Sequence, residues 1–487
     1  MQFNKNRSER KSREKKVTIV NAGTARKAVV ATSVGNAMEW FDFGIYSYLA
    51  VTIGQVFFPQ VSGPAQLVFS FATFGIAFLV RPIGGLFFGM LGDRLGRKRI
   101  LAITLIMMAM ATLSIGLIPG YASIGIAAPI LLLIARLVQG FSTGGEYSGA
   151  MTFIAESTPD RKRGVFSSGL EAGTLVGYIF GSGIVTLLSF LLGEEAMLAW
   201  GWRIPFLIAT PIGIIGLYLR EHMEETPAFK AVKRAREAKE RRPASLRYIL
   251  TYHWRALLIG LFLVFFYNVV NYTVLTYMPA HLSAMLGYNQ TSGLLWLLIV
   301  MIVMIPIVLF MGHISDRIGA RRVVQGGLIG LIVLTLPAFW LIGSGQSAAV
   351  FLGLLILAAF LASFQGTMPS LLPSLYFTSV RYGALSITYN VSTSLFGGTT
   401  PLVVAQLIQV TGNKLVPAYY MILSCLIGIV FVTFFVKETA GKPLRGSAPA
   451  VETKQEAQNV QSADRPLWWH SERKAIEHRM VDRAESR

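Results

Sequence analysis

Twelve long apolar segments run through the 487-residue chain, and they constrain its fold more than any other feature. A membrane-crossing helix needs about 20 apolar residues, and the 53% of hydrophobic residues suffices for about twelve such helices. Only 14% of the residues are charged, against about 25% in an ordinary soluble domain. The segments lie near residues 28–57, 66–91, 100–119, 127–155, 164–192 and 203–219, and near 255–279, 292–313, 323–343, 348–372, 383–410 and 415–436. Since their pattern is helical and lacks the ten-residue alternation of an outer-membrane barrel, we predict an all-α polytopic membrane protein.

Positive charges gather on one side of the predicted membrane. The net charge is +19, and 40 of the 44 Lys and Arg residues fall in the two tails or in the loops that follow the even-numbered helices. Because basic loops stay in the cytoplasm, both termini are expected to be cytoplasmic, in a multi-pass protein of a bacterial inner membrane. Such loops face anionic lipid, which accounts for the net charge without nucleic acid.

The polar stretches divide the chain into five parts. These are a basic N-tail (1–27), a first six-helix half (28–219), a basic linker (220–254), a second six-helix half (255–436) and a C-tail (437–487). We expect both tails and the linker to be cytoplasmic, with anionic membrane lipid as a partner.

One motif occurs once in each half. Gly-x-x-x-Asp-Arg-x-Gly follows the second helix and again the eighth, which indicates a repeat of six helices. Its glycines permit a tight turn, and its aspartate can cap a helix or pair with an Arg. The expected cytoplasmic gate therefore comprises Gly89, Asp93, Arg94, Gly96 and Arg97 in the first copy, with Asp316, Arg317 and Gly319 in the second. Transporters built of repeats bind their substrate near the midplane, between the repeats.

These residues resemble the signature of the major facilitator superfamily, and Arg136-x-x-Gln139-Gly140 resembles its second motif. More narrowly, three stretches resemble the metabolite:proton symporters: Asn36-Ala-Met-Glu39-Trp40-Phe41-Asp42-Phe43-Gly44, Arg81-Pro-Ile-Gly-Gly and Gly144-Gly-Glu146-Tyr147. The resemblance implies twelve transmembrane helices in two six-helix pseudo-repeats, the major facilitator fold. Within this family the likeness is greatest to members that import proline and glycine betaine. It therefore implies proton symport of a zwitterionic compatible solute (proline, glycine betaine or ectoine), activation by osmotic upshift, and no cofactor apart from protons.

Four acidic residues fall clearly inside the predicted spans: Glu39, Asp42, Glu146 and Glu171. A carboxylate in hydrocarbon is costly, so such a residue faces a cavity, a partner or a proton. Glu39 lies roughly 16 Å into the first span, close to mid-bilayer. Burial favours the protonated form of a carboxyl group, so we expect all four residues to couple protons to transport. Glu171 is the weakest candidate because it lies nearer the cytoplasmic interface, and the alternative for Glu39 is a structural pair with an Arg.

A zwitterion calls for aromatic faces, which attract an ammonium group, and for a cation near its carboxylate. The first helix offers Trp40, Phe41 and Tyr46, and the seventh offers Tyr267, Tyr272 and Tyr277. The expected substrate-binding residues are Asn36, Trp40, Tyr46, Arg136, Tyr272 and Tyr277. Arg136 has an alternative role as a counter-ion in helix packing, whereas Arg81, near the end of the second helix, is expected to be structural.

Other functions remain open at this stage. The nearest is a proton-coupled dicarboxylate or other organic-acid symporter, although a dianion needs two deep cations. Another is a membrane sensor that does not transport. An enzyme is least expected, because Gly140-Phe-Ser-Thr-Gly144 matches a nucleophile motif without the strand that this motif needs. One cysteine, Cys425, and six scattered histidines predict no metal site. The oligomeric state stays open.

Overall fold

The computed structural model describes residues 17–95, 97–222 and 246–462. Its first half is built from helices α2 to α11, in which several predicted spans are made of two shorter helices. They are α2 (Ala22–Tyr48), α3 (Ala50–Phe57), α4 (Gly63–Leu79), α5 (Arg81–Leu95), α6 (Arg97–Leu117), α7 (Tyr121–Ile124), α8 (Ala127–Ser142), α9 (Glu146–Glu156), η1 (Asp160–Lys162), α10 (Arg163–Ala196), η2 (Met197–Gly201) and α11 (Arg203–His222).

The second half repeats this arrangement, and two short strands lie outside the two sets of membrane helices. Its elements are α13 (Leu246–Tyr252), α14 (Trp254–Asn271), η3 (Tyr272–Tyr277), α15 (Met278–Ala280), η4 (His281–Met285), α16 (Gln290–Ile318), α17 (Ala320–Ile342), α18 (Ser347–Ser374), α19 (Arg381–Ser392), η5 (Thr393–Gly397), α20 (Thr400–Thr411) and α21 (Val416–Phe435). Strand β1 (Thr18–Ile19) precedes α2 and pairs in parallel with β2 (Ala450–Val451), which is followed by α22 (Lys454–Ser462).

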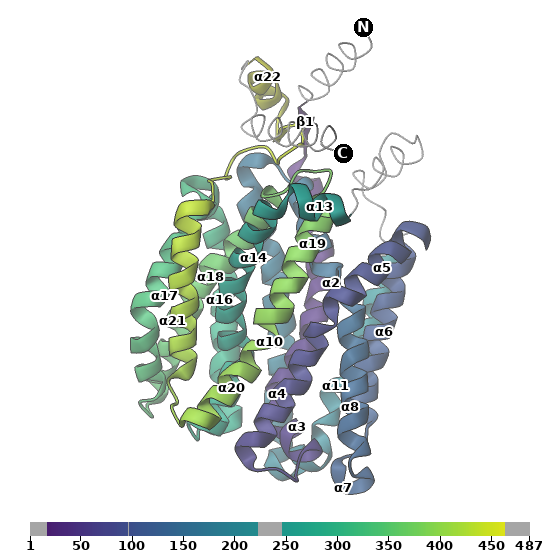
Figure 1. Ribbon diagram of the computed structural model, residues 1–487, viewed down its shortest axis with the longest axis vertical. Helices are drawn as coiled ribbons and strands as arrows, with labels where there is room; N and C mark the ends of the chain where they lie inside the picture. Colours follow the sequence, from purple (N-terminus) through teal and green to yellow (C-terminus); the bar gives the residue numbers. More distant parts are fainter. Residues whose placement is uncertain (1–16, 96, 223–245, 463–487) are drawn as a thin grey trace.

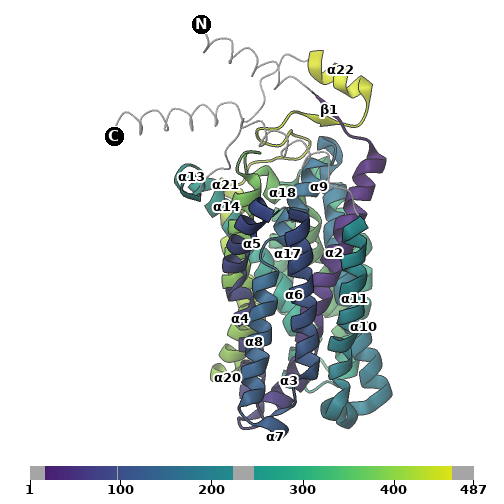
Figure 2. The same ribbon diagram turned by 90° about the vertical axis from the view of Figure 1, so that its right-hand side faces the viewer.

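The two halves stand side by side as one elongated bundle of helices (Figure 1). The first half, purple to blue, packs along the second, teal to yellow, through α10 against α16 and α4 against α20. Strand β1 and α22 lie at one end of the bundle, called the tail end below, while α3, α7 and α20 lie at the far end (Figures 1 and 2). The predicted fold of twelve helices in two six-helix halves is confirmed.

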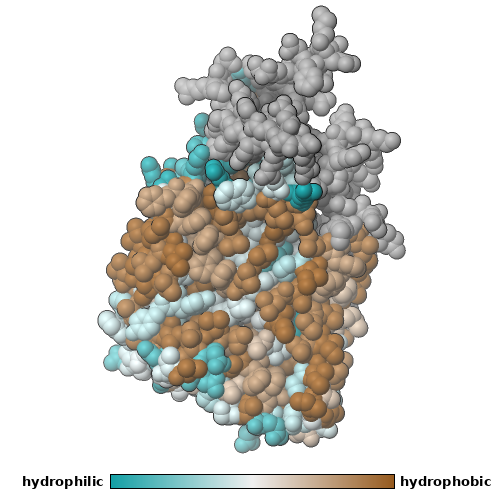
Figure 3. All heavy atoms as spheres, in the orientation of Figure 1, coloured by the Kyte–Doolittle hydropathy of each residue, from teal (hydrophilic) through white to brown (hydrophobic). Residues whose placement is uncertain are grey.

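The outer surface of the bundle is apolar, as a membrane protein requires. Figure 3 shows a broad hydrophobic face between more polar ends, and large side chains such as Phe190 and Phe434 are 77% exposed. Counting only the described residues, nine helices are long and apolar enough to cross a membrane, and Ile103–Leu117 is a shorter apolar helix. The chain is therefore a multi-pass membrane protein.

Several predicted spans break where glycine or proline brings two helices together. The span predicted at 66–91 divides between α4 and α5, next to Pro82, which cannot donate a backbone hydrogen bond. The break packs against the diglycine between α8 and α9, where a side chain on Gly144 would lie 2.2 Å from the Arg81 carbonyl oxygen. The close approach puts Arg81 inside the bundle.

A glycine stripe on α10 fixes its contact with α2. Side chains on Gly169, Gly173 and Gly177 would overlap Val29, Ser33 and Ala37, respectively, of α2. Small residues allow helix backbones to approach closely in a membrane. The stripe thereby holds Glu171 of α10 and Trp40 of α2 at one level of the bundle.

Candidate functional site

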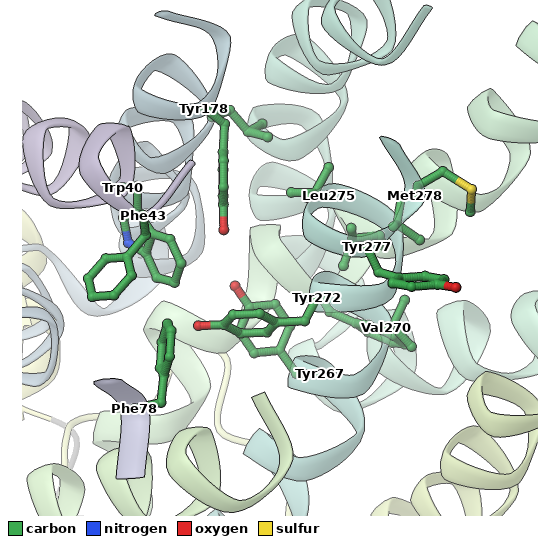
Figure 4. Close-up of a cluster of buried hydrophobic side chains, with 14 of the residues drawn as sticks. Trp40, Phe43, Phe78, Tyr178, Tyr267, Val270, Tyr272, Leu275, Tyr277 and Met278 are labelled. Carbon is green, nitrogen blue, oxygen red and sulfur yellow. The ribbon is translucent and has the colours of Figure 1, made fainter. Parts of the chain in front are cut away.

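Four aromatic side chains from both halves meet near the middle of the bundle, and we call them the aromatic cage: Trp40 (α2), Tyr147 (α9), Tyr178 (α10) and Tyr272 (η3). The Trp40 ring centroid lies 5.4 Å from that of Tyr178, 6.2 Å from that of Tyr272 and 6.3 Å from that of Tyr147. In Figure 4 the hydroxyl group of Tyr178 points toward the Tyr267 and Tyr272 rings, and the hydroxyl group of Tyr272 points toward Phe78. All four residues are at most 3% exposed. The cage is thus a polar-edged aromatic surface buried between the halves.

The local backbone places Tyr272 in the cage. The seventh span changes at Tyr272 from α-helix to the π-helical turn η3, and such turns occur frequently at functional sites. The segment η5 of the eleventh span is also π-helical, and the two spans are joined by the Asn268 amide, which donates to the Thr393 hydroxyl at 3.0 Å. Two widened helices of the second half therefore face the cage.

Glu171 lies beside the cage and contacts both halves. Its Oε1 accepts hydrogen bonds from the hydroxyl groups of Tyr147, in the first half, and of Tyr267, in the second, the latter at 3.0 Å. Its Oε2 has no hydrogen-bond partner, and the side chain is fully buried. Tyr389 of α19 stacks on Tyr147 at 4.6 Å and extends the cage. Glu171 follows the start of α10 at Arg163 by eight positions, so its expected place toward the cytoplasmic end of this span stays a prediction, while its side chain is fully buried inside the bundle.

Arg81 brings a positive charge to the neighbourhood of the cage. Its guanidinium pairs with Glu39, and both side chains are 1% exposed. The same guanidinium lies over the rings of Phe43 and Phe78, at 5.4 and 5.1 Å from their centroids. Its Nε and NH1 have no hydrogen-bond partner. The two rings in turn contact the cage, since the Phe78 centroid lies 5.5 Å from that of Tyr272 and the Phe43 centroid 6.3 Å from that of Trp40. The structural role expected of Arg81 is therefore joined by a position next to the cage.

Asn36 holds the cage tryptophan against α10. Its amide donates to the Leu170 carbonyl at 3.1 Å and to the Thr174 hydroxyl at 2.6 Å. Its oxygen accepts a hydrogen bond from the Trp40 indole at 3.1 Å. Asn36 therefore orients Trp40, and its predicted contact with substrate stays a prediction.

The structure places three other predicted site residues in a separate network inside the first half. Arg136 donates to Gln139 and to the Phe74 carbonyl, and its guanidinium lies 4.2 Å from the ring centroid of Tyr46. Gln139 in turn donates to Thr112, whose hydroxyl donates to Asp42 at 3.1 Å. This network is one layer behind the cage, since Phe43 lies between the guanidinium groups of Arg81 and Arg136.

Tyr277 lies apart from the cage, and Glu146 directly precedes the cage residue Tyr147. Tyr277 packs against Phe71 of the first half and against His281, at 5.7 Å in each case, and points away from Tyr272 in Figure 4. Glu146 is half-buried in the first turn of α9, next to Tyr147. These positions test neither the expected role of Tyr277 in substrate binding nor that of Glu146 in proton coupling.

The second copy of the repeated motif joins the halves at the tail end. Asp316 accepts hydrogen bonds from the backbone N–H groups of Gly164 and Val165, at 2.7 and 2.9 Å, at the start of α10. Arg381 of α19 pairs with Glu156 of α9 across the same interface. Gly319 adopts a φ of 107°, which favours glycine, while Arg317 is exposed. The side chains of the first copy, Gly89, Asp93, Arg94, Gly96 and Arg97, lie outside the described residues.

Sequence reasoning missed Tyr147, Tyr178 and Tyr389 as members of the site. The chain has 17 tyrosines, and no pattern separates those that face the other half from those that face lipid. Tyr147 alone had a signal, because it is the last residue of the Gly144-Gly-Glu146-Tyr147 motif. Across the described ranges, no group of three or more His, Cys, Asp or Glu residues is placed to hold a metal ion.

Comparison with known proteins gives the family. The model of the Major Facilitator Superfamily matches residues 32–401. This chain belongs to that superfamily. It is 47% identical over 472 residues to the glycine betaine/proline/ectoine/pipecolic acid transporter OusA of Dickeya dadantii (strain 3937), covering 96% of this chain and 92% of the relative. It is 48% identical over 450 residues to the proline/betaine transporter of Salmonella typhimurium (strain LT2), covering 91% and 90%. The resemblance seen in the sequence motifs is confirmed.

Solved structures of another transporter have the same fold as this chain. The proton:xylose symporter XylE from E. coli, bound to 6-bromo-6-deoxy-D-glucose, superposes with a TM-score of 0.71 at 19% identity. The match covers 87% of this chain and 98% of XylE. Relatives and fold together indicate a multi-pass membrane transporter rather than an enzyme.

Proposed function

We propose that this transporter imports a zwitterionic compatible solute, such as proline, glycine betaine or ectoine, together with protons across a bacterial inner membrane. The tail end faces the cytoplasm in this proposal, as the distribution of basic residues predicts. The observation that carries the proposal is the aromatic cage, buried between the halves, with Glu171 bonded to the cage residue Tyr147 and Arg81 next to Phe78, which packs on Tyr272. The names of the relatives support the class of solute.

The cage suits the cationic end of such a solute. A quaternary or secondary ammonium is attracted to the faces of Trp and Tyr rings, by about 2 kcal/mol or more where water is excluded. Trp40, Tyr178 and Tyr272 present such faces from both halves. A bound ammonium would therefore contact both halves at once, as alternating access around a central site requires.

Arg81 suits the carboxylate end. Two of its nitrogen atoms, Nε and NH1, lack partners, and guanidinium forms strong hydrogen bonds to carboxylates. Arg136, the cation predicted for this role, donates to Gln139 and Phe74 inside the first half. We propose that Arg81 binds the substrate carboxylate and that Arg136 keeps Tyr46 and the Asp42 network in place.

Glu171 is the proposed proton carrier that couples the halves. As a carboxylate, it accepts hydrogen bonds from Tyr147 and Tyr267 together. Once protonated it becomes a donor as well, which changes its bond with Tyr267 across the interface between the halves. Proton uptake would thus alter a contact that must change during transport. Glu39, Asp42 and Glu146 remain further proposed members of the proton path.

Osmotic activation is proposed on the basis of charge. Lys and Arg residues in the tails and the linker would be held on anionic lipid, at about 1 kcal/mol each, and rising salt screens that attraction. Much of this sequence (1–16, 223–245 and 463–487) lies outside the described residues. The test is uptake by proteoliposomes of varied anionic-lipid content over a range of lumenal salt. Full activity at low osmolality, independent of lipid charge, would contradict this part of the proposal.

Uptake by proteoliposomes tests the solute and its site together. Labelled glycine betaine, proline, ectoine and a dicarboxylate are supplied with and without an inward proton gradient. We expect the zwitterions to accumulate and the dicarboxylate not to, because Glu39 already balances the charge of Arg81. Accumulation of the dicarboxylate alone would establish an organic-acid symporter, and no flux of any solute would favour a sensor.

Two variants of Tyr272 distinguish the contribution of its ring from that of its hydroxyl group. Tyr272→Leu removes the aromatic face and is expected to raise the KM for glycine betaine about tenfold or more, as the loss of a desolvated cation–π contact predicts. Tyr272→Phe keeps the face and should change KM less than about threefold. Equal effects of both variants would show that the ring does not hold the ammonium.

A further inference from the structure

A segment after the last membrane helix crosses the tail end of the bundle from one half to the other. We call residues 439–452 the terminal strap, and Figure 2 shows the chain between α21 and α22 lying over the helix ends. Its first residues, 439–441, cover a crevice between the halves. The other walls of that crevice include Arg163 and Gly164 of the first half and Ser315 and Asp316 of the second.

The middle of the strap is fastened to the second half. The Arg445 carbonyl accepts hydrogen bonds from the Thr378 N–H at 2.9 Å, the Thr378 hydroxyl at 3.0 Å and the Arg381 guanidinium at 2.9 Å. The Ser447 hydroxyl lies 2.7 Å from that of Thr378. These bonds tie the strap to the loop between α18 and α19.

The end of the strap is fastened to the first half. The Ala450 N–H donates to the Asp160 carboxylate at 3.0 Å, and the Glu452 carboxylate lies 2.6 Å from the Lys162 ammonium. Strand β1 adds two backbone bonds of 2.8 Å, from Thr18 to Pro449 and from Val20 to Val451. Because β1 comes just before α2, this pairing ties the strap to the first membrane helix.

We propose that the terminal strap is a clamp that holds the tail end closed and must release one half before the tail end opens. Ala450 follows Ser447 by three positions, and three residue steps span at most about 11 Å when fully extended. Once movement of the halves would draw Ser447 and Ala450 beyond that distance, one set of bonds must break. The inference rests on the proposed function only in that transport by this fold requires the tail end to open.

Labelling of one buried thiol measures this opening without any substrate. Ser168 of α10 is fully buried against α16, where a side chain on Gly312 would overlap its hydroxyl group at 2.5 Å. On a Cys425→Ala background, Ser168→Cys supplies a thiol that a maleimide reaches only when the halves part. Its labelling rate in proteoliposomes therefore reports opening, even if the proposed solutes are wrong.

Loosening the strap should speed labelling. Ala450→Pro removes the N–H that binds Asp160, and Glu452→Gln removes the charge that pairs with Lys162. We expect the double variant to be labelled about fivefold faster or more, as the loss of roughly one net hydrogen bond predicts. Glu456→Gln is the matched control and should leave the rate unchanged, because its 3.9 Å pair with Arg161 is exposed and glutamine keeps an oxygen that can accept the Glu452 N–H. An unchanged rate in the double variant would overturn the clamp.

Locking the strap should slow the labelling of the Ser168→Cys thiol. One disulfide joins Thr378→Cys to Ser447→Cys and a second joins Thr18→Cys to Ala450→Cys, positions that are paired in the structure. Either disulfide alone leaves one half free, so labelling should stay within about twofold of the parent. Both together should slow labelling tenfold or more, since the halves are then tethered through the short stretch from 447 to 450 and the four positions from Thr18 to the start of α2. Labelling at the parent rate with both disulfides formed would refute the proposal, and misfolding cannot produce opposite effects in the loosened and locked proteins.

Discussion

Asp316 joins the two halves at the tail end, and Asp316→Asn should shift the transporter toward opening there. The carboxylate accepts two backbone N–H bonds, of 2.7 and 2.9 Å, from the first turn of α10. Asparagine keeps one acceptor oxygen and presents an amide N–H₂ to the second donor. Hydrogen bonds to a charged group contribute about 1.5–3 kcal/mol, and the negative charge at a helix N-terminus adds about 0.3–1 kcal/mol. We therefore expect a loss of about 2 kcal/mol, or roughly a 30-fold shift toward the open tail end.

The chain offers a matched control for this substitution. Glu438 likewise caps α17, accepting from the N–H groups of Ala320 and Arg321 at 3.0 and 3.2 Å. It also accepts from the N–H groups of Thr439 and Ala440, both at 2.9 Å, but none of these bonds joins the first half to the second. In the labelling assay, Asp316→Asn should speed modification of the Ser168→Cys thiol, whereas Glu438→Gln should leave the rate within about threefold. Equal acceleration by both variants would mean that loss of a helix cap, rather than a broken contact between the halves, explains the effect. No acceleration by Asp316→Asn would reduce the motif to a signal for topology.

Three further outcomes follow from the packing and charges. Gly177→Ala should lower the free energy of unfolding by about 1–3 kcal/mol, because its new methyl group would lie 2.2 Å from the Ala37 carbonyl oxygen. The control Gly183→Ala should leave the free energy of unfolding unchanged, because the nearest atom to its new methyl group is 4.0 Å away. Glu39→Gln should destabilise the protein by about 3–5 kcal/mol in detergent unfolding, since it strands the buried Arg81 charge, and a double-mutant cycle with Arg81→Gln should show strong coupling. Tyr267→Phe should lower the rate of proton-driven uptake with little change in thermal stability; wild-type uptake would exclude its bond with Glu171 from coupling.

The helices could be predicted well from the sequence because a membrane imposes a minimum length on an apolar helix. The breaks within the predicted spans could not be predicted from the sequence. The division of the second span at Val80 depends on a close approach of Gly144 to Arg81, which involves another helix distant in the chain. Counting along one continuous helix therefore put Arg81 near the membrane surface, whereas the structure turns it toward Glu39 and the cage.

The site could be predicted in part. Trp40, Tyr272 and Glu171 were selected as aromatic or acidic residues within spans, and the structure brings them together. Tyr178 and Tyr389 could not be selected, because which face of a helix meets the other half depends on packing between the halves. The terminal strap had no sequence signal at all: β1 and β2 are two residues each, and hydrogen bonds to single backbone groups hold the strap in place.

The central claim is that Glu171 couples proton movement to a zwitterion held in the aromatic cage. The most direct test compares two kinds of glycine betaine uptake in proteoliposomes containing Glu171→Gln: accumulation driven by an inward proton gradient, and exchange against internal unlabelled glycine betaine with no gradient. Glutamine preserves the size of the side chain and one acceptor oxygen but cannot carry a proton. The account predicts that exchange continues while accumulation is lost. Gradient-driven accumulation at the wild-type level would contradict it.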